Sequence, residues 1–174
     1  LRRWPLPGSQ APDDTTRWLL LGAAGTAGAY GLALLATPSG ASAFWPWPVD
    51  VFHARMYASA FIAPAVAAFV LVRRCTAAEL LILGAALAVF GTMSLAGMSW
   101  THLAAPVERQ VDFTTPGTAL FVLMQTLLIG WGGALMARAA ARGAMPALPD
   151  RTLRWFALGM GVAFVMAAVG GFVP

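Results

Sequence analysis

Residues 52–98 read FHARMYASAFIAPAVAAFVLVRRCTAAELLILGAALAVFGTMSLAGM. The two apolar stretches in this segment, 52–72 and 77–98, are each long enough to cross a bilayer, because a transmembrane helix needs about 20 mostly apolar residues. Only the sequence Arg-Arg-Cys-Thr separates them. We therefore predict two consecutive transmembrane helices that form an antiparallel hairpin.

Further stretches of the same kind occupy residues 18–36, 118–137 and 153–173. The predicted fold is all-α, an integral membrane bundle of five transmembrane helices within residues 17–174, preceded by a tail of residues 1–16. Hydrophobic residues make up 59% of the chain and charged residues 10%, a balance that excludes a soluble domain. No extramembrane segment is long enough to form a nucleic-acid-binding domain.

The arginines predict the orientation of this bundle. Nine of the eleven arginines lie before the first stretch, between the second and third, or between the end of the fourth and the first residues of the fifth. Arginines close to span ends are retained on the cytoplasmic side. We therefore predict a cytoplasmic N-terminus and an external C-terminus, in the inner membrane of a bacterium.

The two predicted external loops are rich in aromatic and polar side chains. Trp45, Trp47 and Trp100 occupy positions typical of the external membrane–water interface, where indole rings prefer the headgroup layer. Prolines alternate with the first two tryptophans and stiffen that loop. We expect the two loops to lie side by side if the bundle is compact.

Arg55 lies about one turn inside the second span, where an unpaired guanidinium is costly. The candidate carboxylate partners are Asp50, Glu108 and Asp112. One interpretation is a structural ion-pair cluster that joins the two loops. The other is a binding site for an anion or a lipid headgroup.

His53 and His102 are candidate ligands for a metal or a pigment, because a neutral imidazole can bind zinc, haem iron or the magnesium of a chlorophyll. No third ligand has the spacing of a known motif, and interfacial histidines commonly bond only to water or backbone. The single cysteine, Cys75, excludes an internal disulfide and a C-x-x-C site. No cofactor is required by the sequence, although a lipid, a carotenoid or a chlorophyll-type pigment is compatible with it.

Small residues predict where helices approach one another, because helix association in membranes depends on close backbone contact. The first span has such a stripe in Gly25, Ala29 and Ala33. We interpret this stripe as helix packing. Pro64 removes one backbone hydrogen bond from the second span and should bend it.

Part of the sequence resembles a known family. The matching features are FWPWPV at residues 44–49, the pair Ala54-Arg55, His102, and Asp112-Phe113 shortly before Pro116. Residues 30–135 thereby resemble a group of uncharacterised bacterial multi-span membrane proteins that share an F-W-P-W loop. The sequence departs from that group at Asp50, Val51 and His53, where a Leu/Thr-Pro type turn is usual. The resemblance implies a helical bundle with a rigid external loop and transfers no catalytic residue.

These observations favour a non-catalytic accessory or structural subunit of a larger membrane complex. Photosynthetic or respiratory electron-transfer complexes are the expected hosts, and membrane lipids and other transmembrane subunits are the expected partners. An enzyme is disfavoured because no nucleophile stands beside a suitable base. The alternative is a small transporter or lipid-handling protein that uses the external region of Arg55 and Asp50.

Overall fold

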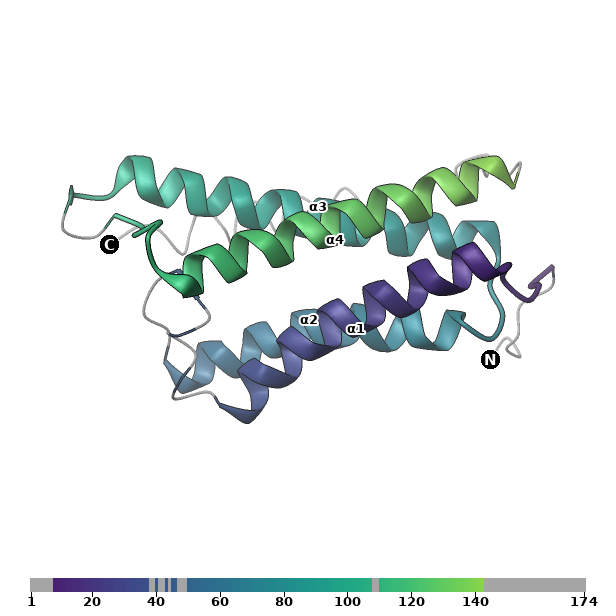
Figure 1. The fold of residues 1–174 in the computed structure, drawn as a ribbon, viewed down its shortest axis with the longest axis horizontal. Helices are drawn as coiled ribbons and strands as arrows, with labels where there is room; N and C mark the ends of the chain where they lie inside the picture. Colours follow the sequence, from purple (N-terminus) through teal and green to yellow (C-terminus); the bar gives the residue numbers. More distant parts are fainter. Residues whose placement is uncertain are drawn as a thin grey trace, which may run out of the picture. The chain divides into compact units, whose positions relative to one another are not determined.

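The computed structural model describes residues 8–37, 40, 43, 45–46, 50–107 and 110–142 of the 174-residue chain. Four α-helices run through this part: α1 (Asp14–Ala36), α2 (Val51–Leu71), α3 (Ala77–Ala104) and α4 (Pro116–Ala141). Figure 1 shows them, from α1 in purple to α4 in green. The described residues contain no β-strand, and an isolated antiparallel bridge pairs Gln10 with Cys75.

Each of these four helices is long and apolar enough to cross a membrane. They lie where the sequence predicts the first four spans, so the all-helical fold is confirmed for this part of the chain. The predicted fifth span, 153–173, lies outside the described residues. α1, α3 and α4 are longer than predicted, at 23, 28 and 26 residues, because helical geometry continues into end residues beyond the apolar stretches, such as Asp14, His102 and Arg138.

Each helix begins at a residue whose side-chain oxygen caps it. Such an oxygen accepts a hydrogen bond from a first-turn N–H that has no partner inside the helix. Asp13 accepts from the Thr16 N–H at the start of α1, and Asp50 accepts from the His53 N–H at the start of α2. Thr76 accepts from the Glu79 N–H at the start of α3, and Thr115 accepts from the Thr118 N–H at the start of α4. The α3 cap is reciprocal, because the Glu79 carboxylate accepts from the Thr76 N–H. Local sequence therefore determines where the helices start.

The bundle is built from two helix pairs. α3 packs most extensively on α4, and α1 packs on α2 (Figure 1). α1 also contacts α4, whereas α2 and α3 touch only slightly. The predicted hairpin of the second and third spans is thus not a packing unit, although its connection is short. The partner of each helix is decided by surface shape rather than by loop length.

Glycines provide that shape between α3 and α4. A Cβ atom on Gly84 would come within 2.7 Å of the Gly132 carbonyl oxygen, and a Cβ on Gly132 within 2.5 Å of the Gly84 carbonyl oxygen. A Cβ on Gly91 would lie 2.7 Å from the Gln125 carbonyl oxygen. Real side chains do not approach backbone this closely, so the two helices touch only because these positions are glycine.

The small-residue stripe predicted for helix packing, Gly25, Ala29 and Ala33, is not such a close contact. Gly25 and Ala29 are exposed, Ala33 is half-buried, and a Cβ on Gly25 would meet no atom within 4 Å. The contact of α1 with α2 uses Gly31, where a Cβ would lie 3.1 Å from the Ala58 carbonyl oxygen. Gly25 and Ala29 therefore do not pack the four described helices together. Their face of α1 is open.

Candidate functional site

Aromatic rings fill one end of the bundle, which we call the Trp45 end because it contains that residue and the starts of α2 and α4. Trp45 is only 7% exposed. Its indole stacks on the ring of Tyr57, with centroids 4.7 Å apart and planes 4° from parallel. It also meets the edge of Phe121 at 4.9 Å. The connection between α1 and α2 is thereby attached to both α2 and α4.

The aromatic cluster continues into the bundle through Phe61. The Phe61 ring meets Tyr30 of α1 at 4.8 Å and Phe90 of α3 at 5.1 Å, both edge to face. Rings from all four helices thus belong to one cluster. Each such pair contributes about 0.5–1.5 kcal/mol beyond the burial of its area. The Trp45 end is therefore a packed structural core.

The indole of Trp45 turns into the bundle and not toward lipid headgroups, which corrects the interface prediction for this residue. The reason is the set of rings around it, which offers an indole more contact than the headgroup layer does. Trp100, by contrast, is 65% exposed near the end of α3, as an interface residue should be. Trp47 lies outside the described residues.

Asp50 and His53 form a pair at the start of α2. The Asp50 carboxylate accepts the His53 backbone N–H at 3.0 Å and contacts the imidazole Nδ1 with its other oxygen. The His53 N–H and then the imidazole hold the pKa of Asp50 below its usual value. A carboxylate on Nδ1 orients the ring and leaves Nε2 directed away from it. The pair is solvent-exposed and would present one imidazole nitrogen to a ligand.

Arg55 lies one turn into α2 and is exposed. Within the described residues it makes no ion pair with Asp50 or Asp112. Asp50 is occupied by His53, and the Asp112 carboxylate accepts from the Thr114 hydroxyl and backbone N–H. The Thr114 bonds lower the pKa of Asp112. Glu108 lies outside the described residues, so the predicted ion pair of Arg55 with Glu108 stays a prediction.

His102 lies in the last turn of α3, and its ring meets the ring of Phe113 at 4.9 Å. Its Nδ1 is buried and has no hydrogen-bond partner among the described residues. In the same part of the chain, no group of three or more histidine, cysteine, aspartate or glutamate side chains could hold a metal ion. Ligation of a metal or pigment by His53 or His102 stays a prediction.

Gln125 is one of three buried polar side chains among the described residues, with Thr16 and Thr118. It lies on α4, is fully buried, and neither its Oε1 nor its Nε2 has a hydrogen-bond partner among the described residues. An unpaired buried amide costs roughly 1–3 kcal/mol. The sequence shows a lone glutamine within an apolar span but does not show which way it faces.

A carboxylate pairs with two arginines at the opposite end of the four described helices, which we call the Asp13 end because Asp13 caps α1 there. Asp13 pairs with Arg138 at 2.7 Å and with Arg142 at 3.0 Å. The Thr16 backbone N–H, then Arg142 and Arg138, hold the pKa of Asp13 far below its usual value. One carboxylate thus joins the start of α1 to the end of α4.

Arg142 extends this network to the connection between α2 and α3. Its Nη1 donates to the Cys75 sulfur at 3.4 Å, and Cys75 is only 1% exposed. Backbone hydrogen bonds of 3.0 and 3.1 Å pair Cys75 with Gln10. Sequence reasoning used these arginines only for orientation. The sequence signal for a shared partner was the spacing of Arg138 and Arg142, because residues four apart share a helix face.

Comparison with known proteins finds no relative: no family model matches the chain, and no curated protein and no solved structure matches it. The geometry of the described residues is therefore what a functional proposal must use.

Proposed function

We propose that the chain is a non-catalytic helical subunit of a larger membrane complex in the bacterial inner membrane. The main support is the outward surface of the four helices. Only about a third of each span is buried inside the bundle, and large apolar side chains such as Leu32, Phe69 and Ile82 point outward. Such surfaces accept lipid tails or the helices of other subunits.

The open face of α1 supports a helix partner in particular. Gly25 and Ala29 are four residues apart, exposed, and without a packing role among the described helices. Small residues at this spacing let a second helix approach the backbone closely. Within such a complex, photosynthetic or respiratory electron transfer is the host class we favour, because those assemblies contain small helical subunits.

The proposal is tested by assembly in cells. Blue-native electrophoresis of solubilised membranes, with mass spectrometry of the proteins that migrate together, should give partners at fixed stoichiometry. Gly25→Leu with Ala29→Leu should release the chain from that complex while it stays inserted. Gly133→Leu is the matched control, because Gly133 is exposed on α4 and a Cβ there also meets nothing within 4 Å. Migration of the unmodified chain without partners would overturn the proposal.

We further propose five spans, with the N-terminus cytoplasmic and the C-terminus external. The native Cys75 is a poor reporter of this, because it is buried beneath Arg142. In a Cys75→Ser background, Val107→Cys places a thiol at an 80% exposed position of the Trp45 end. Ala11→Cys places one at an exposed position of the Asp13 end.

An impermeant maleimide added to intact cells should label Val107→Cys, and should label Ala11→Cys only after permeabilisation. A cysteine added after Pro174 should behave like Val107→Cys, since a fifth span brings the chain back across the membrane. Reversed labelling would invert the orientation. Labelling of the added C-terminal cysteine only after permeabilisation would reduce the number of spans to four.

A further inference from the structure

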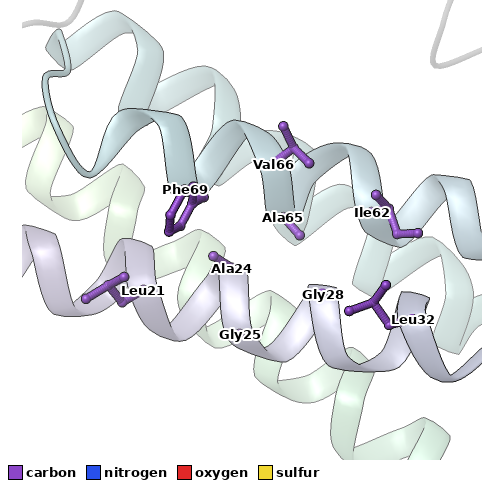
Figure 2. Close-up of a pocket in the computed structure, with 9 residues that line it drawn as sticks. All are labelled: Leu21, Ala24, Gly25, Gly28, Leu32, Ile62, Ala65, Val66 and Phe69. Atoms are coloured by element: carbon purple, nitrogen blue, oxygen red, sulfur yellow. The ribbon is translucent and has the colours of Figure 1, made fainter.

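An apolar groove runs between α1 and α2 on the outside of the bundle. Its volume is about 470 Å³, within the range of roughly 300–1,000 Å³ that is usual for small-molecule sites. Figure 2 shows Leu21 of α1 and Phe69 of α2 toward one end, and Leu32 and Ile62 toward the other. Gly25 forms part of the wall. Every lining side chain is apolar, so the groove suits a hydrocarbon chain.

The length of the groove matches one leaflet of a bilayer. The separation of Leu21 from Leu32 along α1 corresponds to about 16 Å, at roughly 1.5 Å per residue. That is close to half of the ~30 Å hydrocarbon core. A partner helix would run along the whole span, whereas a lipid tail belongs to one leaflet. The dimensions of the groove therefore favour a lipid tail, which would share Gly25, but not Ala29, with the face of α1 proposed for a partner helix.

Arginines stand at one end of the groove. Arg17 is four residues before Leu21 on α1, and residues four apart lie on one face of a helix. Arg73 lies in the turn that follows α2, two residues after Leu71, and its N–H bonds to the Val70 carbonyl oxygen at 3.4 Å. Both arginines are exposed, about one turn beyond the apolar lining.

Two of the acidic groups nearby are engaged elsewhere, whereas Asp14, in the first turn of α1, is exposed and makes no ion pair among the described residues. Asp13 pairs with Arg138 and Arg142, and the Glu79 carboxylate accepts from Thr76. Within the described ranges, neither Arg17 nor Arg73 takes part in an ion pair. Trp18, three residues before Leu21, is 72% exposed, as is typical of indoles at the headgroup layer. This end of the groove therefore presents a net positive charge at the depth of lipid headgroups, with Arg17, Arg73 and Arg74 against Asp14.

We propose that the groove binds an anionic phospholipid, with one acyl chain between α1 and α2 and the phosphate beside Arg17 and Arg73. Basic pockets between transmembrane helices recognise anionic headgroups in this way. The site lies at the Asp13 end and is distinct from the region of Arg55. It adds a specific lipid to the proposed subunit and does not depend on the identity of the host complex.

The experiment uses the purified full chain and native mass spectrometry with two lipids of identical tails, phosphatidylglycerol and phosphatidylcholine. The unmodified protein should retain one phosphatidylglycerol in preference to phosphatidylcholine. Arg17→Gln and Arg73→Gln should each weaken phosphatidylglycerol binding about fivefold, and together about 25-fold, at the usual contribution per basic residue. Phosphatidylcholine binding should change little. Both side chains are exposed, so the fold should survive, which circular dichroism checks.

Arg55→Gln is the control of equal charge change at the opposite end of the bundle, and it should leave the affinity unchanged. The groove itself is tested by Val66→Trp, which should reduce binding of both lipids by filling the space for the tail. Val89→Trp is the matched control, because Val66 and Val89 are each 56% exposed and only Val66 lines the groove.

Four outcomes would overturn the proposal. Equal binding of the two lipids would show that the arginines do not recognise the headgroup. A loss of phosphatidylglycerol binding confined to Arg55→Gln would place the headgroup site at the other end of the bundle. Unchanged lipid binding in Val66→Trp would show that the acyl chain does not lie in the groove. A lipid-free dimer that Val66→Trp disrupts would assign the groove to a second copy of the chain. Failure of the subunit proposal would instead appear as missing partners in cells, with lipid binding intact.

Discussion

Trp45 and Tyr57 lie face to face, with ring centroids 4.7 Å apart and planes 4° from parallel. Trp45 belongs to the connection after α1, and Tyr57 belongs to α2. Because the same indole also meets Phe121 of α4, one side chain holds a loop and two helices. The Trp45 end depends on this contact more than on any exposed charge.

We expect Trp45→Ala to lower the free energy of unfolding by about 3 kcal/mol, since truncating a large buried aromatic side chain leaves a cavity. Trp100→Ala should change it by less than about 0.5 kcal/mol, because that side chain is 65% exposed. Thermal unfolding in detergent, followed by circular dichroism, compares the two. Similar losses in both variants would mean that the aromatic cluster does not stabilise the bundle.

The contact of α3 with α4 predicts opposite effects at two adjacent glycines. Gly132→Ala should cost about 1–3 kcal/mol, because its Cβ would collide with the backbone of Gly84 and Ala88. Gly133→Ala should be neutral or slightly stabilising, because its Cβ meets nothing within 4 Å and alanine favours helix. Thermal unfolding in detergent, followed by circular dichroism, compares the stabilities of the two variants. A neutral Gly132→Ala would show that the two helices can separate without cost.

The Asp13 network predicts a loss of stability in acid. The Thr16 N–H, then Arg142 and Arg138, depress the folded-state pKa of Asp13 below its unfolded value, which is about 3.9. The stabilisation is therefore complete above that unfolded value and declines as the pH falls below it toward the folded pKa. Asp13→Asn keeps the helix cap but removes the charge.

Melting temperatures of the unmodified chain and Asp13→Asn should consequently differ at pH 7 and converge as the pH is lowered below about 4. The comparison is made in one detergent at constant ionic strength. A difference that is the same at every pH would assign the effect of the substitution to the cap and not to the ion pairs.

Gln125→Leu should leave the free energy of unfolding unchanged or raise it by about 1 kcal/mol. The amide is fully buried without a hydrogen-bond partner among the described residues, and leucine has a similar size without polar atoms to satisfy. Thermal unfolding measures the difference. A clear loss of stability would reveal a partner for the amide, such as an internal water molecule.

Local sequence was sufficient to locate the first four spans. An apolar stretch of about 20 residues identifies a membrane-crossing helix without any tertiary contact. The caps Asp13 and Thr76 act on N–H groups three residues away. The limits of α2 differ from the predicted ones by one residue, whereas α1 begins four residues earlier than predicted and α3 continues to Ala104.

Tertiary structure alone decided which side chains face inward. Lipid tails are as apolar as a protein core, so an apolar helix in a membrane carries no polar face to mark its outer side. Gly25 and Gly84 look alike in the sequence, yet only Gly84 lies where another backbone needs the space. Trp45 turned inward because rings of several helices meet around it. The pairing of Asp13 with Arg142 joins residues 129 apart in the sequence, and only the folded bundle brings them together.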